Sequence, residues 1–272
     1  MLKKLFIIAL LYCSHNASAQ TKFTYDAAGN RLTRKSEGTL VQLNVKVYLQ
    51  GAYRVALSAM GNEMQNYFGG NNGLLPKTDP YGSGAVYNNI GNPVGVAGPV
   101  VDWVKVEIRK ASDPAIVLQT KSLLLKTNGN VVDVDGTVPK FFSESVPVHI
   151  IVRHRNHLAV MSSVLPAFSA ATVTHDFTTA LAKAFAVPGD PPQLTSINGK
   201  WAMSAGDLNQ DYGVDATDHS IGQFAFGQGI FGAYNSADIN MDGAVDSIDM
   251  SMLINAVGLG YYSSLYNFDP VL

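Results

Sequence analysis

Residues 207–218 read DLNQDYGVDATD, and residues 238–249 read DINMDGAVDSID, which repeats the same pattern 31 residues later. In each segment an Asp or Asn stands at positions 1, 3, 5, 9 and 12. Calcium takes about six to eight hard oxygen ligands, which a D-x-N-x-D run and a later carboxylate supply from one loop. The spacing therefore predicts two calcium-binding loops, with one ion in each. The predicted ligands are Asp207, Asn209, Asp211, Asp215 and Asp218 in the first loop, and Asp238, Asn240, Asp242, Asp246 and Asp249 in the second.

The two loops differ at position 6, where the chain has to turn sharply. The second loop has Gly243 there, whereas the first has Tyr212, with Gly213 one place later. Because such a turn favours glycine, the second loop is predicted to bind calcium more tightly. Position 8 holds Val214 and Val245, which a short strand between the paired loops would bury. No helical periodicity precedes either loop, so the entering helix of an EF-hand is not expected.

Charge is divided unevenly along the chain. Residues 201–272 contain nine Asp and no Glu, Lys or Arg, whereas residues 20–200 contain 17 Lys and Arg against 12 Asp and Glu. An acidic segment of this kind repels itself, and it either stays unfolded or collects cations. The loop spacing favours the second outcome, so the charge distribution supports metal binding.

The first residues have the features of a secretory signal, predicted to span residues 1–19. Two lysines precede the apolar run from Leu5 to Tyr12, and Ala17-Ser18-Ala19 forms a cleavage site, so the mature chain is expected to begin at Gln20. No later stretch reaches the roughly 18 to 20 apolar residues that span a bilayer. The only cysteine, Cys13, lies within the signal. We therefore expect a secreted or cell-surface protein without a membrane span or a disulfide.

The part of the chain before the loops is predicted to be mainly β, as an antiparallel β-sandwich over residues 41–186. Apolar and polar residues alternate in several short runs, which is the period of a half-buried strand. Turn signals such as Asn128-Gly129 and Asp135-Gly136 separate these runs, and no long helix intervenes. Residues 61–99, rich in Gly, Asn and Pro, are predicted to form a long loop. Strands are expected at residues 43–49, 104–108, 115–118, 122–125, 148–152, 158–162 and 172–177.

Proline residues suggest where this sandwich ends. Pro188, Pro191 and Pro192 predict a linker over residues 187–198, followed by a small calcium-binding module over residues 199–272. Residues 20–40 are predicted to be an N-terminal tail. If few contacts cross the linker, a chain that ends at Pro192 should fold alone. The alternative is that aromatic residues after the linker pack onto the sandwich and make one cooperative unit. These residues are Phe224, Phe226, Phe231, Tyr234, Tyr261, Tyr262, Tyr266 and Phe268.

The paired D-x-N-x-D-x-x-V-D-x-x-D loops resemble the dockerin module over residues 205–258. The resemblance implies a small α unit with two calcium loop-helix repeats, whose helices run from about 217 to 226 and from 247 to 257. It also implies docking on a cohesin within a polysaccharide-degrading assembly. In dockerins, loop positions 10 and 11 and basic residues along the helices select the cohesin. Here those positions are Ala216-Thr217 and Ser247-Ile248, and the helices carry no Lys or Arg, which argues against a cohesin-like partner.

Two further resemblances concern the larger part of the chain. Residues 25–32, YDAAGNRL, match one unit of the YD repeat of RHS-type surface proteins. Over residues 41–258 the chain resembles a haemagglutinin-like family of secreted Bacteroidota surface proteins, which implies a role at the cell surface. The motifs that carry this second resemblance are VYLQGAY, NGLLPKTDPYG, VDWVKVEIR, VVDVDG, VRHRNHLAVMS and AGDLNQD, in that order.

Four histidines raise the question of a metal or acid–base cluster, because imidazole titrates near neutrality and binds transition metals. They are His149, His154, His157 and His175. The first lies on the predicted outward phase of its strand, and the next two flank a turn. We therefore interpret them as surface or hydrogen-bonded structural residues.

Three other side chains were candidates for ligand contacts. Arg153 and Arg155 are interpreted as solvated, with an acidic glycan as the alternative. Trp103 lies on the strand phase opposite to Val104 and Val106. It is predicted either to stack on a sugar ring as an exposed platform or to cap an open sheet edge.

The motifs of common enzymes are missing from the sequence, including G-x-S-x-G, H-E-x-x-H, the phosphate loop and the dinucleotide fingerprint. Asp102, Asp133 and Asp135 lie in strand or turn contexts that structure alone explains, although paired carboxylates for glycoside hydrolysis need only tertiary proximity. We predict a secreted or cell-surface, non-catalytic calcium-binding protein for adhesion, glycan binding or assembly. Its expected partner is a glycan or a surface protein, and not a nucleic acid. The alternative is a glycoside hydrolase acting on polysaccharide and attached through the dockerin-like module.

Overall fold

The computed structural model describes residues 20–25, 31–37, 39–67, 73–89, 98–168 and 171–269. The predicted signal, residues 1–19, lies outside these ranges, as do residues 26–30 in the middle of the YD-like motif.

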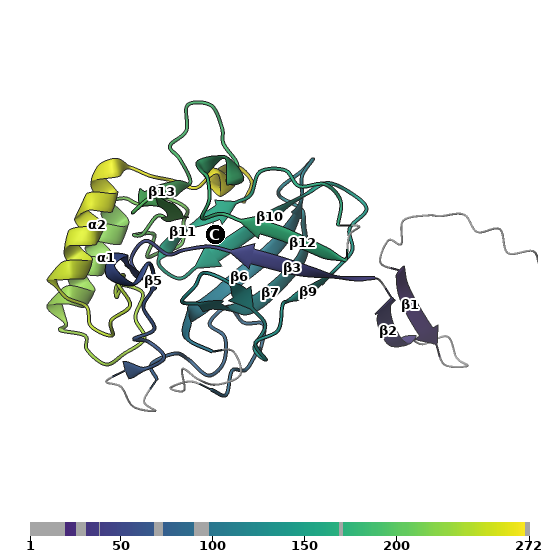
Figure 1. Ribbon diagram of the computed structural model, residues 1–272, viewed down its shortest axis with the longest axis horizontal. Helices are drawn as coiled ribbons and strands as arrows, with labels where there is room; N and C mark the ends of the chain where they lie inside the picture. Colours follow the sequence, from purple (N-terminus) through teal and green to yellow (C-terminus); the bar gives the residue numbers. More distant parts are fainter. Residues whose placement is uncertain are drawn as a thin grey trace, which may run out of the picture.

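Two β-sheets enclose the main core (Figure 1). The five-stranded sheet is antiparallel, with the strand order β11-β10-β6-β7-β8. The three-stranded sheet has the order β12-β3-β9. Apolar side chains of both sheets, such as Leu43, Val104 and Ile150, are fully buried together. The strands are β3 (Leu40–Lys46), β6 (Val100–Lys110), β7 (Val117–Lys126), β8 (Val131–Val132), β9 (Lys140–Phe142), β10 (Val148–His154), β11 (His157–Met161) and β12 (Thr172–Asp176).

This architecture confirms the predicted β-sandwich, with two corrections. The strands β12 and β3 are parallel, with Thr172 opposite Gln42, so the sheets are not antiparallel throughout. Local turn signals fix the direction only of strands joined by a hairpin, and these two strands lie far apart in the chain. The two strands predicted at residues 115–118 and 122–125 form the single strand β7, because its ladder with β6 continues through the polar residues between them.

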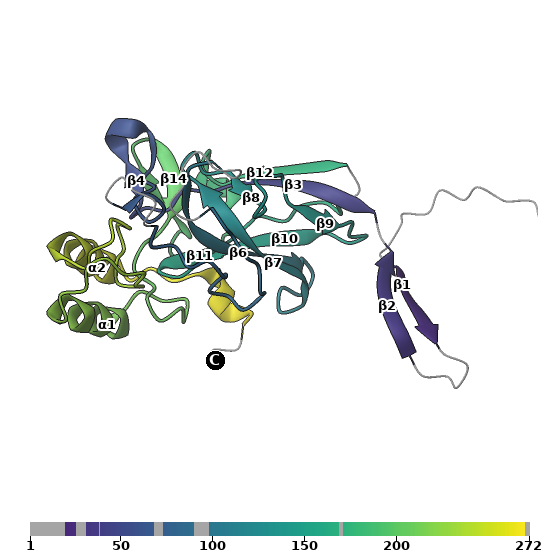
Figure 2. The same cartoon turned by 90° about the horizontal axis from the view of Figure 1, so that it is seen from below.

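Smaller hairpins complete the β structure. β1 (Gln20–Tyr25) and β2 (Arg31–Glu37) pair where a tail was predicted, and they extend away from the sandwich (Figures 1 and 2). β4 (Tyr53–Arg54) and β5 (Ala59–Met60) flank the short helix η1 (Val55–Leu57). The predicted loop over residues 61–99 has no named helix or strand in its described part.

The segment predicted as a linker returns to the sandwich. β13 (Leu194–Ile197) pairs with β14 (Lys200–Met203), after the short helix η3 (Leu181–Lys183). Leu194, Ala202 and Met203 are fully buried in the main core. The N–H of Met203 also donates to the carbonyl of Tyr48, at 2.8 Å. The chain therefore contributes this hairpin to the sandwich before it enters the first loop.

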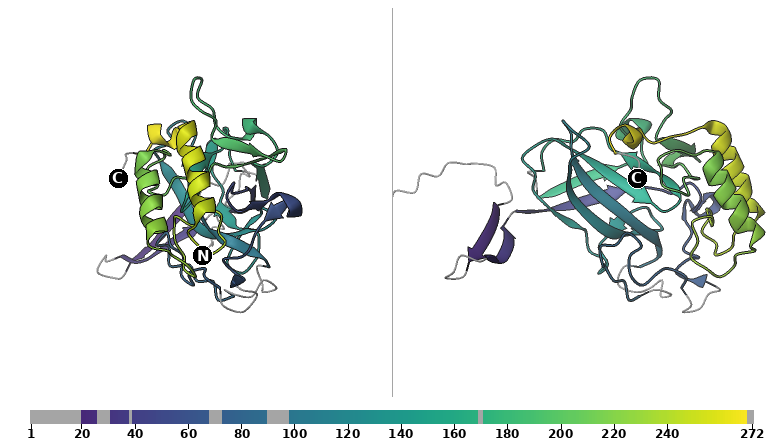
Figure 3. Two further views of the ribbon diagram at one scale, coloured as in Figure 1. Left: turned by 90° about the vertical axis from the view of Figure 1, so that its left-hand side faces the viewer. Right: turned by 180° about the vertical axis from the view of Figure 1, so that it is seen from behind.

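Two helices lie side by side at one end of the molecule, opposite the β1–β2 hairpin (Figures 1 and 3). They are α1 (Ala216–Gly227) and α2 (Ser247–Leu259), within one or two residues of the predicted bounds. We call residues 205–258 the helical unit. Its small core includes Leu208, Ala225 and Leu253. Within the described ranges, no helix has the length and apolar character that crossing a membrane requires.

After α2, residues 261–269 run back along the sandwich and include the short helix η4 (Ser264–Asn267). We call them the C-terminal segment. Leu265 of this segment and Tyr212 of the first loop pack with Ile151 of β10 in a second small core. This contact covers the face of β6 and β10 that the alternating pattern had assigned to solvent. Glu107, Arg109 and His149 on that face are consequently buried.

Candidate functional site

Each predicted calcium loop leads directly into a helix. Asp215 and Asp246, at position 9, cap α1 and α2, because their side chains accept the N–H of the second helical residue, at 2.6 and 2.7 Å. Asp218 and Asp249, at position 12, accept the backbone N–H of the capping residue in return, both at 2.9 Å. This reciprocal capping box satisfies N–H groups that the first turn of a helix otherwise leaves unpaired.

The aspartate at position 12 also ties the two ends of each loop together. Oδ1 of Asp218 accepts the N–H groups of Leu208 and Asn209, at 2.7 and 3.2 Å. The second loop repeats both contacts through Asp249, at 2.7 and 2.9 Å. Both carboxylates are almost fully buried. Positions 1 to 3 and position 12 are therefore adjacent in each loop, as a shared cation site requires.

The residues at positions 3 and 5 are in contact as well. Oδ1 of Asn209 accepts the N–H of Asp211 at 3.1 Å, and the Asn209 amide donates to Asp211 Oδ2 at 2.7 Å. Asn240 and Asp242 form the same pair in the second loop, at 2.9 Å for both bonds. The two loops thus share these internal hydrogen bonds, in agreement with their sequence repeat. In the second loop Asp238 also accepts the N–H groups of Asp242 and Gly243, both at 3.1 Å.

Each loop pairs with the segment that follows the opposite helix. Gly213 forms a bridge with Tyr262, and Ala244 forms one with Phe231. Ala244 lies 31 positions after Gly213, and Phe231 lies 31 positions before Tyr262, so the two bridges occupy equivalent places in the repeat. Val214 and Val245 are buried, as predicted. The short strand predicted between the paired loops is not formed there, because the N–H of each valine pairs instead with the segment after the other loop's helix.

Position 6 has the expected backbone geometry. The φ angle is 76° at Tyr212 and 91° at Gly243, so both residues are in the left-handed region that favours glycine. Gly243 is also required by space, since a Cβ there would lie 2.3 Å from Cε2 of Tyr67. The first loop adopts this conformation with a side chain that strains it, as the sequence predicted.

Buried negative charge accumulates in both loops. Burial and the charges of Asp218 and Asp211 raise the pKa of Asp207 well above its usual range. Burial also raises the pKa of Asp238 to about 7, although Arg155 acts in the opposite direction. In the described residues, Oδ1 of Asp207 is buried without a hydrogen-bond partner. A bound cation would relieve this repulsion and lower both pKa values.

The donor set fits a hard cation such as calcium. Every predicted ligand offers a carboxylate or amide oxygen, which calcium prefers, and none offers sulfur or imidazole. Within the part of the chain that the structure describes, no three side chains of His, Cys, Asp or Glu already stand in ligating positions. The fit therefore rests on the chemistry of the donors and on the unpartnered oxygen of Asp207, and the ligand roles remain a proposal.

The second loop is held directly against the sandwich. The side-chain amide of Asn156, in the turn between β10 and β11, donates to the carbonyls of Ser236 and Asp238, both at 2.9 Å. Arg54 donates to the carbonyl of Asn240, also at 2.9 Å. At Gly51 the two backbones touch, because an added Cβ would lie 2.0 Å from the carbonyl oxygen of Ile239.

A buried ion pair strengthens this contact. Arg155 donates to Oδ2 of Asp102 at 2.8 Å, and the hydroxyl of Tyr234 donates to Oδ1 of the same carboxylate at 2.8 Å. The guanidinium lies 4.3 Å from the Tyr234 ring centre and also donates to the carbonyl of Asn235. Although burial acts in the opposite direction, the charge of Arg155 and a contact with His154 hold the pKa of Asp102 below its usual range.

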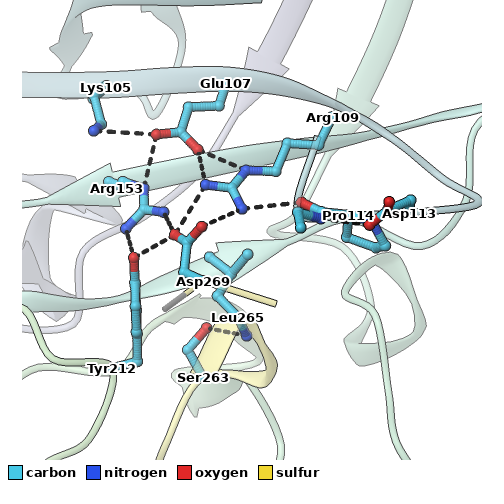
Figure 4. A network of polar contacts seen from close by, with 11 residues as sticks. Lys105, Glu107, Arg109, Asp113, Pro114, Arg153, Tyr212, Ser263, Leu265 and Asp269 are labelled. Carbon is cyan, nitrogen blue, oxygen red and sulfur yellow. Dashed lines mark hydrogen bonds and ion pairs between the residues drawn. The ribbon is translucent and has the colours of Figure 1, made fainter. Parts of the chain in front are cut away.

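A second network joins the polar face of the sheet to the C-terminal segment (Figure 4). Arg109 donates to both carboxylate oxygens of Asp269, at 2.8 and 3.0 Å, and to Glu107 at 2.6 Å. Arg153 donates to Glu107 at 3.0 Å and also to Asp269. The Tyr212 hydroxyl accepts from Arg153 and donates to Asp269. Sequence reasoning missed this network, because Asp269 lies more than 100 residues from both Arg109 and Arg153 in the chain.

Several interpretations of single residues were wrong. Arg153 and Arg155 are not solvated, since each is part of a buried ion pair. Trp103 is neither an exposed platform nor an edge cap, because it is fully buried and its indole N–H donates to the carbonyl of Pro76 at 2.9 Å. Asp102, assigned to a strand context, proves to be a buried partner of Arg155.

The histidines are structural, but none is a surface residue. Nδ1 of His149 lies 2.7 Å from the carbonyl of Ser162, and Nε2 of His157 accepts the N–H of Gly51 at 3.1 Å. His154 lies 3.3 Å from Asp102. Burial lowers the pKa of all four histidines. The prediction that His149 faces solvent was wrong, because the ring of Phe185 lies 5.3 Å from the imidazole and packs on that face of the sheet.

Comparison with known proteins identifies the helical unit. Residues 205–258 match the family described as Dockerin type I domain. The match includes both loops and both helices, and it ends before the C-terminal segment. It confirms the dockerin resemblance for this part of the chain.

Two other comparisons add less. A solved chain of a type II cohesin–X-dockerin complex from Acetivibrio cellulolyticus is similar at 15% identity and a TM-score of 0.35, over 80% of this chain and 95% of that chain. No curated protein matches the chain. The haemagglutinin-like and YD-repeat resemblances stay predictions.

Proposed function

We propose that this protein is a secreted or cell-surface, non-catalytic component of an assembly, attached to it through a calcium-loaded dockerin unit. The observation that carries the proposal is the pair of matching loops, in which the carboxylates at positions 1 and 12 are buried and Oδ1 of Asp207 has no hydrogen-bond partner. Each loop would hold one calcium ion through its five predicted ligands, Asp207, Asn209, Asp211, Asp215 and Asp218 or Asp238, Asn240, Asp242, Asp246 and Asp249.

The outer surface of the helices supports a role in docking. Phe224 on α1 is 71% exposed, and Ile248 and Leu259 on α2 are 54% and 57% exposed. Apolar side chains of this size are usually covered when they cluster on a surface. Ala216-Thr217 and Ser247-Ile248, at loop positions 10 and 11, form the exposed first turns of the helices. We infer a cohesin-type partner that is recognised through apolar contacts, since the helices provide no basic side chain.

Calorimetric titration of the metal-stripped chain with calcium tests the metal sites. The expected stoichiometry is two ions per chain, and Asp207→Ala and Asp238→Ala should each remove one. Asp113→Ala is a matched control, because Asp113 lies in the exposed turn between β6 and β7. Full binding by both loop variants, or no binding by the parent chain, would contradict the proposal.

Docking is tested separately with a panel of purified cohesin domains in saturating calcium. Phe224→Ala and Ile248→Ala should each weaken binding by about tenfold, equivalent to about 1.4 kcal/mol at an interface anchor. Val117→Ala, an exposed apolar residue on β7 far from the helices in sequence, is the control. Equal cohesin binding by all variants would exclude this surface of the helices as the docking site.

The alternative function is a glycoside hydrolase carried by the same dockerin unit. Two acids of the sheet, Asp102 and Glu107, are engaged in ion pairs with arginines, which supports a structural role for them. Release of reducing sugar from mixed polysaccharides would favour the enzyme over the non-catalytic component.

A further inference from the structure

A cavity of about 470 Å³ opens beside the first loop, between that loop and the C-terminal segment. Its volume is within the range of about 300–1,000 Å³ that is common for small-ligand sites. It is separate from Phe224 and Ile248, the residues proposed to dock on a partner. The side chains that line it and matter for recognition are Tyr212, Tyr262, Tyr266, Asp211, Asp215 and Asn267.

The aromatic walls of the cavity are held in place from outside. The hydroxyl of Tyr262 donates to Oδ1 of Asp190 at 2.8 Å, and the hydroxyl of Tyr212 donates to Oδ2 of Asp269 at 2.5 Å. Neither acceptor lines the cavity. Because these hydroxyl groups are engaged elsewhere, the two tyrosines offer mainly ring surface to a ligand. Such fixed rings lose little conformational entropy when a ligand binds.

The third tyrosine is free to meet a ligand. Tyr266 is 55% exposed and lies in η4, which is capped by Ser263, whose side chain accepts the N–H of Leu265. Asn267 follows it in the same short helix and adds an amide group to the cavity. An aromatic ring beside an amide combines an apolar surface with a donor and acceptor of hydrogen bonds.

The charge of the lining restricts the class of ligand. Asp211 and Asp215 contribute carboxylates, and residues 201–272 contain no Lys or Arg. Four aspartates of the first loop, Asp207, Asp211, Asp215 and Asp218, outweigh the two charges of one calcium ion, so the loop keeps a net charge of about -2 with calcium bound and still disfavours an anionic ligand. Carboxylate oxygens accept hydrogen bonds and so suit a ligand rich in hydroxyl donors. Ring faces suit the flat C–H surface of a pyranose.

We propose that this cavity binds a neutral saccharide. The proposal goes beyond the attachment function, since it needs neither a docking partner nor the exposed surface of the helices. Asp211 and Asp215 are shared with the first calcium loop, so binding is to be measured in saturating calcium, with the calcium stoichiometry determined for every variant. Tyr262, Tyr266 and Asn267 are outside that loop and report on the saccharide alone.

The test is titration of the full mature chain with cello-, xylo- and manno-oligosaccharides, followed by saturation-transfer NMR or calorimetry. Tyr266→Ala should weaken binding by about tenfold, and Tyr266→Phe should retain it, since the ring surface is kept. Asp190→Ala should weaken binding by a smaller factor, because it releases the Tyr262 hydroxyl. Phe226→Ala removes another exposed aromatic ring, one that neither lines the cavity nor is assigned to docking, and as the matched control it should bind normally.

Three results would overturn the proposal. One is that none of the three oligosaccharide series binds at millimolar concentration. Another is that saccharide binding survives Tyr266→Ala unchanged, which would move the site elsewhere. The third is that an oligolysine peptide, but no saccharide, binds in a Tyr266-dependent manner, which would make the cavity a cation site. If Tyr266→Ala titrates normally with calcium and binds cohesin normally, a failure of saccharide binding concerns the cavity alone and leaves the proposed attachment function intact.

Discussion

The hydroxyl of Tyr212, in the first loop, donates a hydrogen bond of 2.5 Å to Oδ2 of Asp269 in the C-terminal segment. The same carboxylate accepts from Arg109 and Arg153 on the polar face of the sheet (Figure 4). One aspartate therefore links the calcium loop, the C-terminal segment and the sandwich. The helical unit is consequently not a free plug, and changes in one part should be measurable in the others.

The first prediction is that Asp269→Asn destabilises the whole chain. The substitution keeps the shape of the side chain but leaves Arg109 and Arg153 with less negative charge around them. Removing one partner of a buried pair costs about 3–5 kcal/mol, and because Asp269 is 18% exposed we expect about 2 kcal/mol. For a chain of this size that lowers Tm by about 4–8 °C in a calorimetric scan.

The control for this prediction is Asp113→Asn, which makes the same chemical change at an exposed turn. It should leave Tm unchanged within about 1 °C, because isolated surface charges contribute little. Equal melting of Asp269→Asn and the parent chain would show that the network adds no stability.

The second prediction concerns pH. The N–H donors of Arg109 and the hydroxyl of Tyr212 hold the pKa of Asp269 below its usual range, although burial acts in the opposite direction. In the unfolded chain the pKa of Asp is about 3.9. The unfolded state then binds more protons below that pH, so the stabilisation is full above about pH 5 and is lost as the pH falls through the folded pKa.

The measurement is the difference in unfolding free energy between the parent chain and Asp269→Asn from pH 7 to pH 2. Taking the difference removes the contribution of the buried histidines and of the calcium loops, which both chains share. The difference should be constant down to about pH 5 and shrink below it. A difference that stays constant to pH 2 would show that Asp269 titrates normally.

Much of the fold was predictable because it depends on local pattern. The period-2 alternation located β6, β10 and part of β3, and the dockerin resemblance placed both helices within one or two residues. The loops could be read from sequence because their contacts are short-range, such as those between Asn209 and Asp211. The two loops adopt similar conformations because the repeated residues form the same local hydrogen bonds in each.

The failures have one common physical origin. Alternation predicts which residues share a face of a strand, but not whether that face meets water. His149 and Arg153 do alternate with apolar neighbours. His149 is buried with the ring of Phe185 against it, and Arg153 is half-buried by its contacts with Tyr212 and Asp269. Trp103 is buried because residues of the long loop, including Pro76 and Tyr81, pack against β6. Such long-range contacts leave no periodic signal in the sequence.

The third prediction is that removal of calcium lowers the stability of the full chain. The carboxylates of each loop repel one another, as the raised pKa values of Asp207 and Asp238 indicate, and the charge of Arg155 offsets this only in part at Asp238. At a calcium concentration of about 100 times Kd, binding contributes about 2.7 kcal/mol for each site. Excess EGTA should therefore lower Tm, and calcium but not sodium should restore it. An unchanged melt in EGTA would refute calcium-dependent stability.

The fourth prediction ranks the two loops through position 6. Gly243→Ala should weaken calcium binding in the second loop, because φ is 91° there and an added Cβ would lie 2.3 Å from the Tyr67 ring. Tyr212→Gly relieves the strained residue of the first loop but also removes the hydrogen bond to Asp269. Tyr212→Phe removes only the hydrogen bond and so separates these effects.

Calorimetry on the metal-stripped variants checks the ranking. Asp238→Ala should remove the tighter of two sites and Asp207→Ala the weaker one. Gly243→Ala should reduce the affinity of the tighter site by about tenfold or more, equivalent to at least about 1.4 kcal/mol. A greater loss from Asp207→Ala would reverse the ranking.

The last prediction concerns the boundary suggested by the prolines. A chain that ends at Pro192 keeps the strands of the sandwich but loses Leu194, Ala202 and Met203, which are all fully buried in the main core. Removing a large buried apolar side chain costs about 2–5 kcal/mol, and a domain has only about 5–15 kcal/mol of stability in total. We therefore expect the Pro192 chain to lack a cooperative transition, although the proline cluster alone predicts an independent domain.

A chain that ends at Ser204 provides the comparison, because it retains the β13–β14 hairpin and its core residues. It still lacks Tyr234 and Asp269, so Asp102 loses a donor while Arg109 and Arg153 lose an acceptor. This chain should unfold cooperatively, but at a lower temperature than the full chain in calcium, because the cost of unpaired buried charge remains. Thermal unfolding of the two truncated chains by circular dichroism, with and without calcium, makes the test. A sharp, calcium-insensitive transition of the Pro192 chain at the temperature of the full chain would show that the sandwich is complete before the hairpin and that the helical unit is only attached to it.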